Sequence, residues 1–146
     1  MRKIAPLVLL ICLSLTASAD KLMIPMDATQ KNHLKAYGIA YWVLEQQEEI
    51  EWLLNYKGGS FLMSDYENIE KECLLRGVTF ITMSESRATG IKNEIANPSV
   101  NAEVVKLLKV PKIAVYSPKT AQPWDDAVTM VLKYAEIPYD VVFDDE

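Results

Sequence analysis

The residues best suited to bind a ligand lie in a loop, NYKGGS, that follows an apolar stretch of the chain. Its two adjacent glycines let backbone N–H groups approach an anion, while its lysine and serine add a positive charge and a hydroxyl. The alternative is a plain turn, because the loop has neither a Walker pattern nor G-x-G-x-x-G. The residues expected to hold a carboxylate or phosphate here are Asn55, Lys57, Gly58, Gly59 and Ser60.

A second polar loop, YSPKTAQ, precedes a helix that we predict to begin at Pro123. A helix N-terminus presents N–H groups that suit an anion. Asp125 and Asp126 already place negative charge there, which favours simple helix capping as the alternative. The candidate ligand-binding residues of this loop are Ser117, Lys119 and Thr120.

Residues that could act in catalysis are few and poorly spaced. Cys73 lies on the apolar stripe of a predicted helix, where a free cysteine is commonly a buried hydrophobe. His33 is the only histidine and has no partner at the spacing of a nucleophile–base pair. Adjacent carboxylates, such as Asp125-Asp126, point in different directions and form no acid–base pair by themselves. We therefore predict no catalytic residue, no metal ligand and no cofactor in this chain.

Predicted strands alternate with predicted helices along the chain. The strands are expected at 21–26, 50–56, 78–83, 112–117 and 139–143. The helices are expected at 27–46, 65–76, 85–95 and 123–136, with 99–110 either a short helix or an extended connector. This alternation predicts an α/β fold with a mostly parallel sheet of about five strands, flanking helices and a flavodoxin-like arrangement.

Local signals indicate where these elements begin, end and pack. Asp27 and Gln30 resemble a capping box at the start of the first helix. Gly77 is the expected C-cap of the second helix. The run IEWLLNY is nearly continuous in apolar residues, which is typical of a parallel strand buried on both faces. The last helix carries a clear apolar stripe, formed by Trp124, Val128, Val131, Leu132 and Ala135.

The first 19 residues have the features of an export signal. Arg2 and Lys3 precede an apolar run of about 12 residues, too short to span a bilayer. Ala17 and Ala19 provide the small residues that a signal peptidase requires, so we expect cleavage after Ala19 and a periplasmic or secreted product. No membrane span is expected in that product.

The 146-residue chain has a net charge of −5. Removal of the leader takes away two basic residues, so 13 basic residues then face 20 acidic ones and the net charge becomes −7. This balance argues against nucleic acid as a partner, because such binding depends on Lys and Arg. Two cysteines are too few for a disulfide scaffold.

Three segments are distinctive as a set: LMIPMDATQKNHLKAYGIAYWVLEQ, EWLLNYKGGSFLM and PKIAVYSPKTAQPWDDAVTMVLKYAEIPYDVV. The chain resembles the N-terminal part of exported bacterial proteins often named asparagine synthetase B, which continue into a class I glutamine-amidotransferase-like α/β region. The resemblance implies a signal peptide over 1–19, an N-terminal α/β region over 20–110 and an incomplete start of the amidotransferase-like region over 111–146. It carries no catalytic residue onto this chain, which lacks an N-terminal Cys nucleophile and a Ser-Gly-Gly pyrophosphate loop.

The expected function is an exported α/β scaffold or ligand-binding protein without a complete active site of its own. One alternative is an amidotransferase- or amidohydrolase-like enzyme whose catalytic residues lie downstream. Another is an interaction module of the cell envelope. The partners expected under these readings are a small polar ligand or an envelope protein.

Overall fold

The structure is a computed structural model, and it describes residues 20–117, 120 and 127–143. Its strands are β1 (Lys21–Ile24), β2 (Ile50–Leu54), β3 (Ser60–Ser64), β4 (Ile81–Met83), β5 (Glu103–Leu107), β6 (Ala114–Tyr116) and β7 (Asp140–Val142). Its helices are α1 (His33–Glu45), α2 (Glu67–Arg76), α3 (Glu85–Ile95) and α4 (Ala127–Ala135). The proposed signal peptide and the predicted helix start at Pro123 lie outside the described residues.

Five of the strands form one sheet in the order β4-β1-β3-β2-β5. Every neighbouring pair in this sheet is antiparallel. The chain order β1–α1–β2–β3–α2–β4 with this strand order is the ferredoxin-like, split βαβ arrangement. α3 and β5 extend it, and β5 pairs with β2 along five residues, from Ile50 opposite Leu107 to Leu54 opposite Glu103.

The predicted mostly parallel, flavodoxin-like sheet is wrong. The prediction missed β3, which returns directly from β2 through a hairpin and places Glu51 opposite Leu62. β3 also pairs with β1, so that Lys21 lies opposite Ser64. Because β3 runs between β1 and β2, these two strands are never hydrogen-bonded to each other. α1 does connect β1 to β2 as a crossover helix. However, β3 lies between these two strands in the sheet and runs antiparallel to both.

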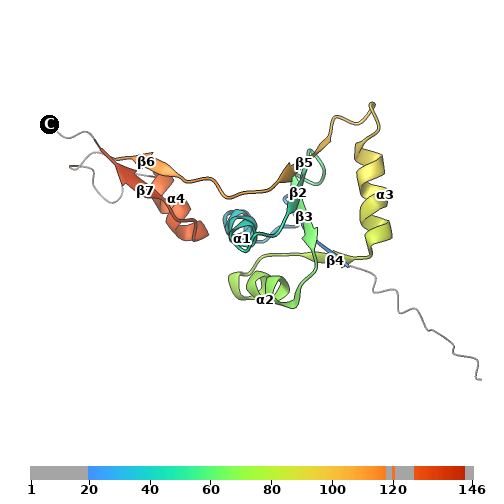
Figure 1. Cartoon of the computed structure of the whole chain (residues 1–146), viewed down its shortest axis with the longest axis horizontal. Coiled ribbons are helices and arrows are strands. Elements are labelled where there is room, and N and C mark those ends of the chain that lie inside the picture. Colours follow the sequence, from blue (N-terminus) through green and yellow to red (C-terminus); the bar gives the residue numbers. More distant parts are fainter. Residues whose placement is uncertain (1–19, 118–119, 121–126, 144–146) are drawn as a thin grey trace, which may run out of the picture.

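The apolar strands are explained by burial on both faces of this antiparallel sheet. α1 and α2 cover one face, where Leu22 and Ile24 of β1 are buried. α3 covers the other face, where Met23 packs with Ile91 and Ile95 (Figure 1). Successive side chains of a strand point to opposite faces, so both sets are apolar only when both faces are covered. The nearly continuous run of apolar residues therefore indicated strands that are buried on both faces. It did not indicate that the sheet is parallel.

Helix boundaries follow their capping groups. α1 starts six residues later than the predicted capping box, because the Asn32 side chain accepts a hydrogen bond from the Lys35 N–H. Gly77 is the C-cap of α2 in a left-handed conformation, with φ of 67°, as predicted. Ser84 caps α3 by accepting from the Arg87 N–H. The ambiguous 99–110 segment contains β5.

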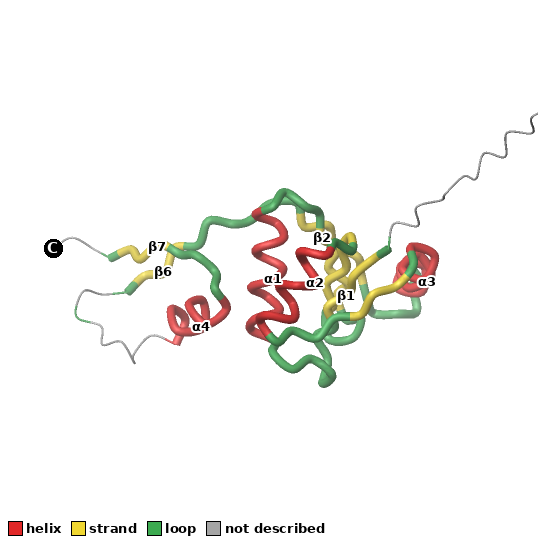
Figure 2. Tube along the Cα trace, turned by 90° about the horizontal axis from the view of Figure 1, so that it is seen from below, coloured by secondary structure: helices red, strands yellow, loops and turns green. Residues whose placement is uncertain are grey.

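The last three elements form a separate βαβ unit beside the main sheet. β6 and β7 pair in parallel, with Ala114 opposite Asp140 and Tyr116 opposite Val142. α4 packs on α1, and α1 lies between this unit and the five-stranded sheet (Figures 1 and 2). We call residues 114–142 the βαβ unit. The strand–helix–strand predicted for the end of the chain is therefore present, with its two strands parallel.

Candidate functional site

The first predicted ligand loop is a hairpin turn whose polar groups bind one another. The Asn55 side-chain amide donates to the Asn101 carbonyl at 2.9 Å. Ser60 is fully buried, and its hydroxyl donates to the Tyr56 and Lys57 carbonyls at 3.0 and 3.3 Å. The Gly59 carbonyl accepts from the Trp52 indole at 3.0 Å. These contacts favour the turn interpretation over anion binding.

Backbone geometry explains the glycines of this turn. Gly58 and Gly59 have φ values of 78° and 92°, which residues with a Cβ rarely adopt. A Cβ at Gly58 would also overlap the Met26 carbonyl group, because the Met26 N–H donates to the Lys57 carbonyl in this close approach. The two glycines therefore serve the contact between the hairpin and the segment after β1.

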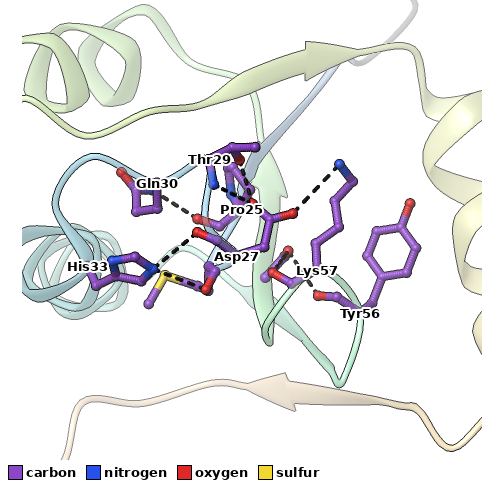
Figure 3. Close-up of polar contacts among 9 residues, drawn as sticks. Pro25, Asp27, Thr29, Gln30, His33, Tyr56 and Lys57 are labelled. Carbon is purple, nitrogen blue, oxygen red and sulfur yellow. Dashed lines mark hydrogen bonds and ion pairs between the residues drawn. The ribbon is translucent and has the colours of Figure 1, made fainter.

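Lys57 faces a carboxylate from that same segment (Figure 3). Its ammonium lies 3.9 Å from Asp27 Oδ2, and both side chains are partly exposed. The Thr29 hydroxyl and N–H donate to Asp27 Oδ1 and hold the pKa of Asp27 below its usual value. Lys57, which was expected to attract an anionic ligand, therefore already lies beside the carboxylate of Asp27.

Gln30 and His33 tie the β1–α1 loop together, and neither was predicted to do so. The Gln30 side chain is buried, donates to the Pro25 and Thr79 carbonyls, and accepts from the Thr79 N–H at 2.9 Å. His33 Nε2 lies 3.2 Å from the carbonyl oxygens of both Met26 and Asp27. Donation to these carbonyls places the ring proton on Nε2. Figure 3 shows both side chains turned onto the loop, where their contacts are structural.

The second predicted loop lies away from the first. The Ser117 N–H donates to the Val142 carbonyl at 3.0 Å and so continues the parallel pair, and Thr120 is exposed. Lys119 lies outside the described residues. The βαβ unit stands across α1 from the main sheet, so Ser117 and the 55–60 hairpin do not form one site (Figure 2).

The single described thiol is unsuited to nucleophilic chemistry. Cys73 is fully buried in α2, and this burial raises the pKa of its thiol to about 12. The thiolate required for attack is therefore absent near neutral pH. Across residues 20–117, 120 and 127–143, no group of three or more His, Cys, Asp or Glu side chains is placed to hold a metal ion.

The most unusual surface of the molecule is apolar and belongs to the βαβ unit. Parallel strands normally lie between layers that cover both faces. Here Val141 and Val142 of β7 are 50% and 45% exposed, and Val131 of α4 is 42% exposed. Among the described strands, β6 and β7 pair only with each other, so each has one edge that no described strand covers. We call the exposed residues Met130, Val131, Val141 and Val142 the apolar surface, which extends over both faces of the β6–β7 pair because successive strand residues point to opposite faces.

The apolar stripe predicted for the last helix is only partly buried in the described protein. Ala135 is buried against Gly38 of α1, whereas Val131 is exposed. Trp124 of the same stripe lies outside the described residues. The helical periodicity identified the apolar side of the helix, but it could not show that little of the described protein covers it.

Within the described part of the chain, no helix combines the length and apolar character needed to cross a membrane. No family model, no curated protein and no solved structure matches the chain.

Proposed function

We propose that this chain is a scaffold and interaction module, in which the 20–110 domain holds a βαβ unit that joins the sheet of a partner α/β polypeptide. The observation that carries the proposal is the apolar surface on a two-stranded parallel sheet. Parallel strands are ordinarily buried on both faces, and the exposed edges of β6 and β7 can accept further strands. The partner is accordingly a polypeptide with apolar strands.

The way the unit is held supports this role. Glu136, just after α4, contacts Lys35 of α1 and lies 3.3 Å from Arg76 of α2. The Asn32 amide donates to the Tyr134 hydroxyl at 2.8 Å. These contacts fix one side of α4 to the domain and leave its apolar side facing outward. A helix anchored this way presents a preformed surface, which lowers the entropic cost of docking.

The resemblance to exported proteins with an amidotransferase-like region is consistent with the proposal. That region is an α/β sheet, and the βαβ unit has the parallel strands that such a sheet requires. In this assembly the chain contributes structure, because Cys73 is buried and His33 contacts loop carbonyls. Export through a leader over residues 1–19 completes the proposal and places the assembly in the periplasm or outside the cell.

A fluorescent dye that binds apolar surface, combined with sedimentation, tests the proposal on the purified protein. We expect a monomer that binds the dye, and we expect Val131→Glu to reduce the dye signal strongly. Val100→Glu is the matched control, because Val100 is an exposed valine of similar exposure, 38%, in the loop between α3 and β5. A stable dimer that hides the surface, or a dye signal unchanged by Val131→Glu, would contradict the proposal.

A further inference from the structure

A cleft of about 540 Å³ lies between the end of α1 and the start of α2. Val43 and Ile69 line it from the core, with exposed fractions of only 0% and 2%. Trp42 and Tyr66 supply two aromatic rings, and Glu48 and Glu67 supply two carboxylates. The docking surface proposed above uses none of these residues, so the cleft is an independent feature.

The charges around this cleft are uncompensated. Among the described residues neither Glu48 nor Glu67 forms an ion pair, and no lysine or arginine lines the cleft. The C-terminus of α1 and the N-terminus of α2 meet here with opposite partial charges that offset each other, so the two carboxylates set the sign of the charge in the cleft. The cleft therefore favours a positively charged ligand.

A second charged cavity shows the contrast. It lies beside β2 and α3, has a volume of about 350 Å³, and contains both signs of charge. There Lys92 pairs with Glu51 at 3.1 Å, and Lys106 lies 3.8 Å from Glu49. Glu49 and Glu51 of this cavity are thus paired with cations, whereas Glu48, which lines both cavities, and Glu67 form no ion pair among the described residues.

The aromatic residues of the cleft add a second kind of attraction for a cation. Tyr66 stands at the N-cap of α2, where Ser, Thr, Asp or Asn is the usual choice, and its side chain makes no capping bond. Capping therefore does not explain why a tyrosine stands at this position. Trp42 is partly buried on the opposite helix. Aromatic faces attract cations, and tryptophan does so most strongly.

We propose that this cleft binds a small organic cation, with the ammonium group between the rings of Trp42 and Tyr66 and its charge balanced by Glu48 and Glu67. Contact with these two rings favours a cation that carries methyl or methylene groups over a metal ion. Quaternary and methylated ammonium groups have this chemistry.

Titration calorimetry of the purified protein with choline chloride tests the proposal. The matched ligand is 3,3-dimethyl-1-butanol, which has the same shape but a carbon in place of the charged nitrogen. We expect millimolar binding of choline and none of the neutral analogue. We expect Glu48→Gln and Tyr66→Leu each to weaken choline binding about fivefold or more.

Glu94→Gln is the control, because Glu94 is an exposed residue of α3 outside the cleft and should leave binding unchanged. Circular dichroism of each variant verifies that it is folded, and both altered side chains lie at the surface of the cleft. Equal binding of choline and its neutral analogue, no binding of choline at millimolar concentration, or unchanged binding in both cleft variants would each overturn the proposal.

Discussion

Gly38 of α1 lies directly against the carbonyl group of Ala135 in α4, with no space between them for a methyl group. This contact brings α4 onto α1, and Ala135 is buried by it. The βαβ unit therefore depends on one glycine for its close packing against the main domain. Helices approach closely only where a small residue leaves room for the neighbouring backbone.

Gly38→Ala should therefore loosen the βαβ unit while leaving the main sheet intact. Overpacking of this kind costs about 1–3 kcal/mol, more than alanine gains in a helix over glycine. Hydrogen exchange should become faster in 127–135 but not in β1–β3. Gly90→Ala in α3 is the control, since a Cβ there meets no atom within 4 Å. It should stabilise the protein by about 0.5–1 kcal/mol. Unchanged exchange in α4 of Gly38→Ala would refute the contact.

Glu136 should make the docking of α4 sensitive to acid. Lys35, and with it Arg76, lowers the pKa of Glu136 in the folded protein. Stability from this group is therefore present above its ordinary value of 4.5 and is lost as the pH falls below that value. Glu136→Gln should cost less than about 1 kcal/mol at neutral pH, because the carboxylate is half-exposed. Thermal unfolding between pH 3 and 7 measures this effect. If the unfolding temperature of Glu136→Gln depended on pH in the same way as that of the native chain, Glu136 would contribute nothing to the acid sensitivity.

Gln30 should be the most sensitive polar residue of the main domain. Gln30→Ala would leave the Thr79 N–H, the buried Pro25 carbonyl and the partly buried Thr79 carbonyl without their partner. The expected cost is about 2–3 kcal/mol in denaturant unfolding. Lys31→Ala, at the exposed neighbouring position, should change stability by less than about 0.5 kcal/mol. Equal effects of the two substitutions on the free energy of unfolding would mean that the hydrogen bonds of the Gln30 amide do not stabilise the domain.

Cys73 should be unreactive in the folded protein. Burial raises the pKa of its thiol to about 12 from a usual 9.0. The folded state therefore holds the proton that the unfolded state releases, and stability from this group falls as the pH rises from about 9 towards about 12. A thiol reagent at pH 8 should label Cys73 only after denaturation. Cys73→Ala should lack this part of the alkaline decline, and rapid labelling of the native protein would contradict the burial.

The sequence located most elements, but it did not reveal their direction. Gly77 ended α2 as predicted, because a left-handed C-cap depends on local chemistry alone. The direction of the strands depended on β3, whose SFLMS segment follows the two glycines. Two apolar runs joined by a glycine turn are a hairpin signal, and that signal would have identified β3.

The candidate binding residues show a different limit of sequence reading. The residue types around Lys57 suit an anion, yet Asp27 is beside it through a contact 30 residues away in the chain. The α1–α2 cleft was not predicted, because Trp42 and Tyr66 lie on separate helices whose packing the sequence does not show. Residues within one loop can be recognised from sequence, whereas a site built between helices depends on the tertiary fold.

The central claim is that the apolar surface docks onto a partner α/β polypeptide, and photo-crosslinking tests it most directly. A photoreactive phenylalanine would replace Val131 or Val142 in the cell, with Glu94 on α3 as the control position. The proposal predicts crosslinks from Val131 and Val142 to apolar strands or helices of one α/β polypeptide, and none from Glu94. Crosslinks to a second copy of this chain, equal crosslinks from Glu94, or none from the apolar surface would contradict it.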